Sequence, residues 1–249
     1  MNVFVKPNEQ NDARINYAMA RKGRMKSNMR LLFQATAKFL LGLLLVALLL
    51  FLPAGTVCYW QAWLFIGVLF VPMLIMGTVL MCRNPELLRH RLDAREKEGE
   101  QKTAVILGGL LFVAVFIMAG LNFRYRWWLV PDSLVMTAAV VFLLGYLMYA
   151  EVMRENVWLS RTIEVQEHQQ VVDKGLYGVV RHPMYTATLI LFLTTPVILA
   201  SVWSFLIMLL YFPIIVKRIR NEEKLLEREL NGYLEYMQRV RWRLIPWIW

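Results

Sequence analysis

Charged residues are missing from four long stretches of this 249-residue chain: residues 39–82, 103–123, 133–150 and 183–216 contain no Asp, Glu, Lys or Arg. Over the whole sequence only 18% of residues are charged, while 58% are hydrophobic. Soluble domains usually have about 25% charged residues, so this balance excludes an ordinary water-soluble protein. A helix needs about 20 apolar residues to cross a bilayer. The sequence therefore predicts an all-α, multi-pass transmembrane helical bundle.

The lengths of the uncharged runs predict about six membrane helices. Residues 39–82 are long enough for two spans that meet near Pro53, and the next two runs supply one span each. At about 1.5 Å per residue, residues 183–216 are too long for one crossing and too short for two full crossings. We expect this last run to form a helical hairpin that turns near Pro196, and the sequence leaves open whether the hairpin crosses completely.

Cysteine and histidine are scarce, which bears on metal and redox chemistry. Cys58 and Cys82 lie singly within or at the end of apolar runs, without the C-x-x-C spacing of a metal or redox site. The three histidines, His90, His168 and His182, lack the i, i+3 or i, i+4 spacing of helical metal ligands. The sequence thus predicts packing cysteines and no metal centre.

The distribution of charge divides the chain into three parts. Residues 1–38 carry eight Lys or Arg without a cleavage-site pattern, so we predict a basic N-terminal arm rather than a secretory signal peptide. Residues 39–152 would form a four-helix transmembrane region. Residues 153–249 contain two polar segments that flank the final hairpin, and this C-terminal region is where we expect a functional site.

The two sides of the predicted membrane protein differ in charge. With six spans, both termini and residues 83–102, 154–182 and 217–243 lie on the same side. The opposite side retains only Arg124, Arg126 and Asp132. An excess of Lys and Arg predicts that the charged side is cytoplasmic. The net charge of +10 then reflects attraction to anionic lipid headgroups, and we predict no nucleic-acid partner.

The first polar segment ends in Arg181-His182-Pro183, directly before the last apolar run. In a structural interpretation, Pro183 suits the first turn of a helix and Arg181 holds a lipid phosphate. In a functional interpretation, the free backbone N–H groups of the helix start, with Arg181 and His182 beside them, form a site for a carboxylate or phosphate. These residues alone do not favour either interpretation.

The second polar segment, residues 218–243, has the pattern of an amphipathic helix with a break at Asn231-Gly232. Its apolar face consists of Ile219, Leu226, Leu230, Tyr233, Met237 and Val240. We expect this face to lie against the bilayer surface. Near the start of the segment, Glu222 and Glu223 are either solvated charges or part of a site.

Together the two segments resemble the isoprenylcysteine carboxyl methyltransferase family and the related membrane phospholipid methyltransferases, most closely bacterial members. The first half of the family pattern is matched by Gly175, Tyr177, Arg181, His182, Pro183 and Tyr185. The second half is matched by Glu222, Glu223, Gly232, Tyr233, Tyr236 and Pro246. Leu176 departs from the pattern because proline is usual there, and Ala187-Thr188 replace a common glycine. The match runs from Glu151 to the end of the chain.

The resemblance implies that S-adenosylmethionine binds in residues 153–249, which would then be the catalytic region. The implied catalytic residues are Arg181, His182, Glu222, Glu223 and Arg241. The implied cofactor-binding residues are Gly175, Tyr177, Val180, His182, Pro183, Tyr185, Glu223, Tyr233 and Tyr236. Among these, Glu222 or Glu223 would bind the cofactor or fix Arg181, and Arg241 would steer an anionic group of the substrate.

The resemblance thus predicts an integral membrane methyltransferase that acts on a lipidic or hydrophobic acceptor, with membrane lipids as its surroundings. Carboxyl O-methylation of an isoprenylcysteine-like substrate is favoured, and N- or S-methylation stays open. The expected location is the bacterial inner membrane with both termini cytoplasmic, and oligomeric state is left open. One alternative is an NADPH-dependent reductase, because membrane sterol reductases carry a similar Arg-His-x-x-Tyr stretch. The other is a non-enzymatic transporter or scaffold.

Overall fold

The computed structural model describes residues 7–92, 99–156, 158–159, 165–166 and 168–249. Throughout these residues the regular structure is helical and no β-strand is formed. The α-helices are α1 (Pro7–Ala54), α2 (Trp60–Arg83), α3 (Pro85–Leu92), α4 (Gly99–Tyr125), α5 (Asp132–Glu155), α6 (Pro183–Ile198), α7 (Val202–Met208), α8 (Tyr211–Glu229) and α9 (Tyr233–Arg239). The predicted all-α, multi-pass membrane bundle is confirmed.

Five of the described segments are long and apolar enough to cross a membrane. They are Asn28–Ala54, Trp60–Arg83, Thr103–Tyr125, Asp132–Glu155 and Val202–Glu229. The sixth apolar helix, α6, has only 16 residues. It forms the predicted hairpin with α7 and α8, and Pro196 lies in its last turn rather than at the bend, which follows at residues 199–201.

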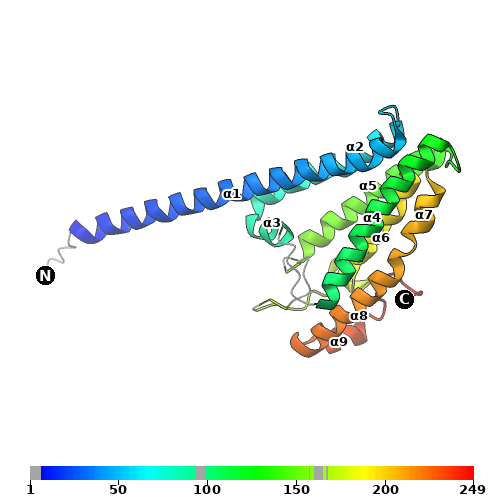
Figure 1. Ribbon diagram of the computed structural model, residues 1–249. Helices are drawn as coiled ribbons and strands as arrows, with labels where there is room; N and C mark the ends of the chain where they lie inside the picture. The colour runs from blue at the N-terminus through cyan, green and yellow to red at the C-terminus, as the bar shows by residue number, and fades with distance from the viewer. Residues whose placement is uncertain (1–6, 93–98, 157, 160–164, 167) are drawn as a thin grey trace.

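Helix α1 extends much further toward the N-terminus than the first uncharged run. It begins at Pro7 and continues unbroken to Ala54, because its only internal proline is Pro53, in the last turn. Figure 1 shows this helix reaching well beyond the rest of the bundle. The residues predicted as a basic arm are therefore largely helical and continuous with the first span, while the three-part division of the chain stays a prediction.

The bend between α6 and α7 is buried and hydrogen-bonded. Ala200 has a positive φ of 53°, and its carbonyl accepts from the Asn122 amide of α4 at 3.3 Å. The neighbouring Leu199 carbonyl accepts from the Tyr59 hydroxyl at 2.5 Å. Buried backbone carbonyls are almost always paired in folded proteins. These contacts therefore satisfy the backbone where the chain reverses direction between α6 and α7.

The connections of the bundle gather at two ends. Figure 1 shows the α1–α2, α4–α5 and α6–α7 connections at one end, and α3, the end of α8 and α9 toward the other. Gly232, with a positive φ of 83°, forms the predicted break between α8 and α9. Both polar segments of the family pattern consequently lie at the same end of the molecule.

The apolar face of the C-terminal segment packs against protein. Ile219 packs with Leu189 and Leu244, while Leu230, Tyr233, Tyr236 and Val240 form a separate buried cluster. The expectation that this face would lie on the bilayer surface is therefore wrong. The face instead joins α8 and α9 to α6 and to the loop that precedes it.

Candidate active site

The Arg181-His182 pair is joined to the C-terminal tail through the backbone. The Arg181 N–H donates to the Trp242 carbonyl at 2.8 Å, and the His182 N–H donates to the Arg243 carbonyl at 2.9 Å. The second bond satisfies the N–H of His182, the N-cap of α6, which has no partner within the helix. Both bonds bring the two halves of the family pattern, about 60 residues apart in sequence, into direct contact.

Glu223 lies at the centre of this junction and is almost completely buried, with 3% of its surface exposed. Its Oε1 accepts from Arg181 Nε at 2.8 Å and lies 3.3 Å from His182 Nε2. Its Oε2 accepts from Arg243 Nε at 2.7 Å. A buried charge must be paired and hydrogen-bonded to be tolerated. Glu223 therefore connects α8, the start of α6 and the C-terminal tail.

The Arg181 guanidinium also binds protein carbonyl groups. Besides Glu223, it donates through Nη1 to the carbonyls of Val240 at 2.9 Å and Arg241 at 3.1 Å. The Arg241 side chain itself is exposed. Arg241 thus contributes its backbone to the junction.

Glu222 has different surroundings although it is adjacent to Glu223. Its side chain is 27% exposed, against 4% for Glu223. Its Oε2 accepts from the Tyr185 hydroxyl at 2.6 Å, and the same hydroxyl accepts from Arg218 Nε at 3.0 Å. Its Oε1 lies 4.0 Å from His182 Nδ1. Successive residues of a helix point about 100° apart, so one carboxylate is buried in protein and the other faces open space.

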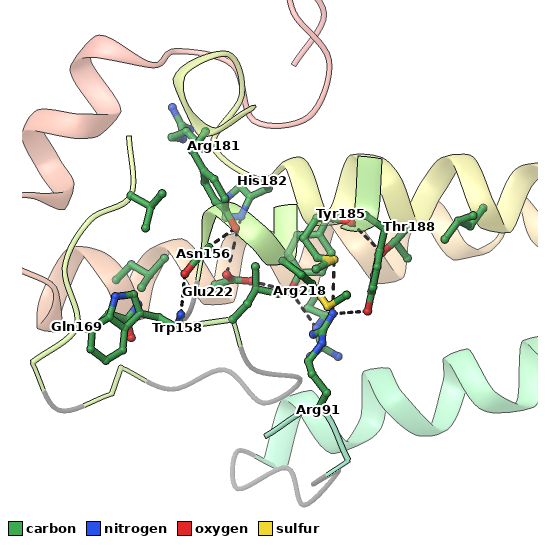
Figure 2. A pocket seen from close by; sticks show the side chains of 18 of the residues that line it. Arg91, Asn156, Trp158, Gln169, Arg181, His182, Tyr185, Thr188, Arg218 and Glu222 are labelled. Carbon is green, nitrogen blue, oxygen red and sulfur yellow. Dashed lines mark hydrogen bonds and ion pairs between the residues drawn. The ribbon is translucent and has the colours of Figure 1, made fainter. Parts of the chain in front are cut away.

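That space is a cavity of about 660 Å³ between the membrane helices and the polar segments. Figure 2 shows its polar part, where labelled side chains of α3, α6 and α8 meet residues of the loop between α5 and α6. Its other walls are apolar: Leu69, Met73, Met76 and Leu80 of α2 line it at i, i+4, i+7 and i+11 spacing. The cavity therefore has a polar end and an apolar end, like an amphiphile.

The residues predicted from the sequence divide into two groups. Those that line the cavity are Tyr177, Arg181, His182, Tyr185, Glu222, Tyr233 and Tyr236. Those that do not are Gly175, Val180, Pro183, Glu223 and Arg241. Val180 is buried and Pro183 begins α6, so the second group holds the backbone or the charges behind the cavity wall.

Three tyrosines of the pattern form one wall of the polar end. The Tyr236 hydroxyl donates to the Tyr177 carbonyl at 2.7 Å, and the Tyr177 hydroxyl accepts from the Asn156 amide at 2.9 Å. Burial raises the pKa of both Tyr177 and Tyr236, so both hydroxyls stay protonated near neutral pH. The buried Tyr233 hydroxyl has no hydrogen-bond partner among the described residues. Because buried polar atoms are nearly always paired, this hydroxyl fits a polar atom of a bound ligand.

Gly175 is required by the position of Glu155. It has a positive φ of 58°, and a Cβ added there would lie 1.6 Å from Glu155 Oε1. Both carboxylate oxygens of Glu155 accept from the Leu176 N–H, at 3.1 and 3.0 Å. This interaction fixes the short 3₁₀ turn, Gly175–Gly178, against the end of α5.

Gly175→Ala is expected to lower the free energy of unfolding by about 1–3 kcal/mol, because the methyl group displaces Glu155 and strains the backbone. Displacing the turn also moves Tyr177, so ligand affinity should fall with stability. Thermal unfolding in detergent measures the first effect. The matched control is Gly109→Ala in α4, where an added Cβ meets no atom within 4 Å. Equal melting temperatures for the two variants would contradict this account of Gly175.

Several cavity residues were not predicted from the sequence. Arg91 of α3, Tyr149 of α5, Asn156 and Arg218 line the polar part together with the pattern residues. Arg91 and Asn156 lie in polar connections, and Tyr149 lies on an apolar helix, where nothing in the sequence separates a cavity residue from a packing residue. The α2 face has helical spacing, but that spacing is common to any packed helix.

Comparisons with known proteins agree with this arrangement. Residues 133–231 match the model of the phospholipid methyltransferase family. The fold is similar to the eukaryotic intramembrane Ras methyltransferase ICMT (isoprenylcysteine carboxyl methyltransferase), with a TM-score of 0.51 and 19% sequence identity. That alignment covers 94% of this chain and 86% of ICMT.

A curated protein is similar over a shorter region. The mouse (Mus musculus) Delta(14)-sterol reductase TM7SF2 is 31% identical over 91 residues. The alignment covers 35% of this chain and 22% of the reductase, so the chain spans only about a fifth of that relative. Residues 133–231 are therefore similar to the phospholipid methyltransferase family, and the membrane fold is similar to that of ICMT, in agreement with the resemblance seen in the sequence.

Proposed function

We propose that this protein is an integral membrane methyltransferase that uses S-adenosylmethionine and acts on a lipidic or hydrophobic acceptor. The observation that carries the proposal is that one and the same cavity is lined by the Arg181-His182 pair, by Glu222 and by an apolar wall on α2. A polar donor and an apolar acceptor can meet in such a cavity. The match of residues 133–231 to the phospholipid methyltransferase family supports the same activity.

The polar end has the groups that S-adenosylmethionine requires. The unpartnered Tyr233 hydroxyl and the Glu222 carboxylate suit the polar atoms of its amino-acid and ribose parts. The faces of Tyr177 and Tyr236 suit its positive charge through cation–π attraction. When bound, it would supply an electrophilic methyl group on a positively charged sulfur.

Within this proposal Glu223 is a positioning residue. Both of its carboxylate oxygens already accept from protein donors, on Arg181, His182 and Arg243. It would act by holding His182 at the cavity wall. Of the two adjacent carboxylates, Glu222 is the one that would contact the cofactor.

A carboxylate is the acceptor that the site favours. Its oxygen would form a bond to the methyl carbon as the carbon–sulfur bond breaks, giving a methyl ester and S-adenosylhomocysteine. Opposite charges are neutralised in this step, so the apolar walls of the cavity favour the transition state over the charged reactants. An amine or thiol acceptor would first have to lose a proton, and His182 would then serve as the base. An isoprenylcysteine carboxylate, which combines the acid with an apolar chain, fits both ends of the cavity.

The proposed location follows from the charge distribution. The end that contains the site also carries most of the Lys and Arg residues, which favours the cytoplasmic side of a membrane. S-adenosylmethionine would enter from the cytosol there, and the acceptor would enter from the lipid. We further propose the bacterial inner membrane, with both termini cytoplasmic.

Calorimetry on the detergent-purified protein tests the cofactor. We expect saturable binding of S-adenosylhomocysteine and no binding of NADPH. The reductase alternative, favoured by the similarity to TM7SF2, predicts the reverse. Absence of S-adenosylhomocysteine binding at millimolar concentration would refute the proposal. If S-adenosylhomocysteine binds, membranes are incubated with methyl-labelled S-adenosylmethionine, and extraction of the labelled product identifies the acceptor.

A further inference from the structure

Arg91 is a cation in the cavity that the proposed reaction does not yet use. Its side chain enters from α3, on the side opposite the labelled residues of α6 and α8 (Figure 2). It donates to the Tyr149 hydroxyl, lies 5.2 Å from the centre of the Tyr149 ring, and approaches the Met184 sulfur at 3.8 Å. None of these partners is negatively charged.

The lack of an acidic partner sets Arg91 apart from its neighbour on α3. Arg89 forms an ion pair with Glu86 at 2.7 Å, whereas no carboxylate of the described residues pairs with Arg91. Arg91 is half-buried in a cavity with largely apolar walls. A cation in such surroundings is costly unless an anion pairs with it. An arginine fork binds a carboxylate or phosphate through two parallel hydrogen bonds.

The position of Arg91 relates it to both ends of the cavity. Its contact Met184 is flanked in sequence by Pro183 and Tyr185 of the family pattern, and the Tyr185 hydroxyl bonds to Glu222. An anion held by Arg91 would therefore lie next to the polar end. The α2 face formed by Leu69, Met73, Met76 and Leu80 lines the same cavity. An apolar chain attached to the anion has this face available.

We infer that Arg91 binds the anionic headgroup of the acceptor and so selects an acidic amphiphile, with its chain along the α2 face. The inference rests on the proposed function and assigns a specificity-determining residue to it. Arg91 contacts the acceptor, while the donor occupies the tyrosine wall formed by Tyr177, Tyr233 and Tyr236.

The test compares binding of N-acetyl-S-farnesylcysteine, which has a free carboxylate, with binding of its neutral carboxamide. Both probes are titrated into wild-type protein, Arg91→Gln, Arg91→Lys and the control Arg89→Gln, which removes the same charge from the same helix. Loss of charge-assisted hydrogen bonds should weaken binding of the carboxylate to Arg91→Gln about 10- to 100-fold. Binding of the carboxamide should change little. Arg91→Lys should be intermediate, and Arg89→Gln should resemble wild type.

Several outcomes would overturn the inference. Equal weakening of carboxylate and carboxamide would mean that Arg91 only supports packing, and unchanged carboxylate binding would mean that it has no role. Failure of the carboxylate to bind wild-type protein would reject an acidic amphiphile. Each titration is run with and without S-adenosylhomocysteine. Binding of S-adenosylhomocysteine to wild-type protein tests the proposed function, so a failure of that function is seen separately from a failure of acceptor binding. If Arg91→Gln lost S-adenosylhomocysteine binding, Arg91 would belong to the donor site instead.

Discussion

Glu223→Ala is expected to abolish methyl transfer and to lower the free energy of unfolding by about 3–5 kcal/mol, the usual cost of removing one partner from a buried ion pair. The Arg181 guanidinium would remain buried without its carboxylate, and Arg243 would lose its contact with α8. The junction between α6, α8 and the C-terminal tail would therefore open. Thermal unfolding in detergent and turnover of labelled S-adenosylmethionine measure the two effects.

The matched control for this variant is Glu227→Ala, which removes an exposed carboxylate from the same helix. It should change neither stability nor turnover, because surface substitutions usually shift stability by less than about 0.5 kcal/mol. Glu222→Gln is the informative comparison, since it alters the cavity without breaking the buried network. It should reduce turnover at nearly normal stability. A fully active and stable Glu223→Ala protein would show that the junction does not support the site.

His182→Ala is expected to lower turnover by at least about 100-fold, the penalty for losing correct placement of reacting groups. The imidazole lies between the two carboxylates, 3.3 Å from Glu223 and 4.0 Å from Glu222, and it lines the cavity. Its removal would widen the polar end and take away the imidazole beside Glu222 Oε1. The backbone bond from His182 to Arg243 would remain, so stability should fall by only about 1–2 kcal/mol.

Stability and activity, measured together, distinguish the role of Glu223 from that of His182. Glu223→Ala should lose stability and activity together, whereas His182→Ala should lose mainly activity and S-adenosylhomocysteine affinity. His168→Ala serves as a control because it removes an exposed histidine that does not line the cavity. Normal affinity and turnover in His182→Ala would remove this residue from the site.

The helices of the bundle were largely predictable because the bilayer imposes a simple requirement. A span must be apolar and about 20 residues long, so the uncharged runs located α2, α4 and α5 to within a few residues of their ends. The beginning of α1 was not predictable in this way. Nothing between Pro7 and Pro53 stops a helix strongly, and hydropathy does not report helix that continues into water.

The candidate site was predictable only in part, because it depends on contacts between residues that are far apart in the sequence. The family pattern predicted Arg181, His182 and the Glu222-Glu223 pair as site residues, and the structure brings these side chains together. The two glutamates are adjacent, and the sequence alone does not reveal how their surroundings differ. Glu223 is buried and contacts three donors, whereas Glu222 faces the cavity. That difference depends on the C-terminal tail returning to α6.

Arg91 illustrates a different limit of sequence analysis. It lies in a basic connection in which arginines are expected for topology alone. Only the placement of α3 beside Tyr149 and Met184 shows that this arginine enters the cavity while Arg89 pairs on its own helix. Charge asymmetry predicts that the site lies at the charged end of the bundle, but it does not show which cation belongs to it.

The shortness of α6 has a consequence for the depth of its polar start. Its 16 residues extend about 24 Å, roughly 6 Å less than the hydrocarbon core of a bilayer. None of these residues is exposed, so neighbouring helices rather than lipid surround α6. The polar groups at its start would therefore lie below the headgroups, at a depth where protein partners satisfy them. In the proposed reaction, a lipid-anchored acceptor would reach these groups by lateral diffusion, with its chain remaining in the hydrocarbon core.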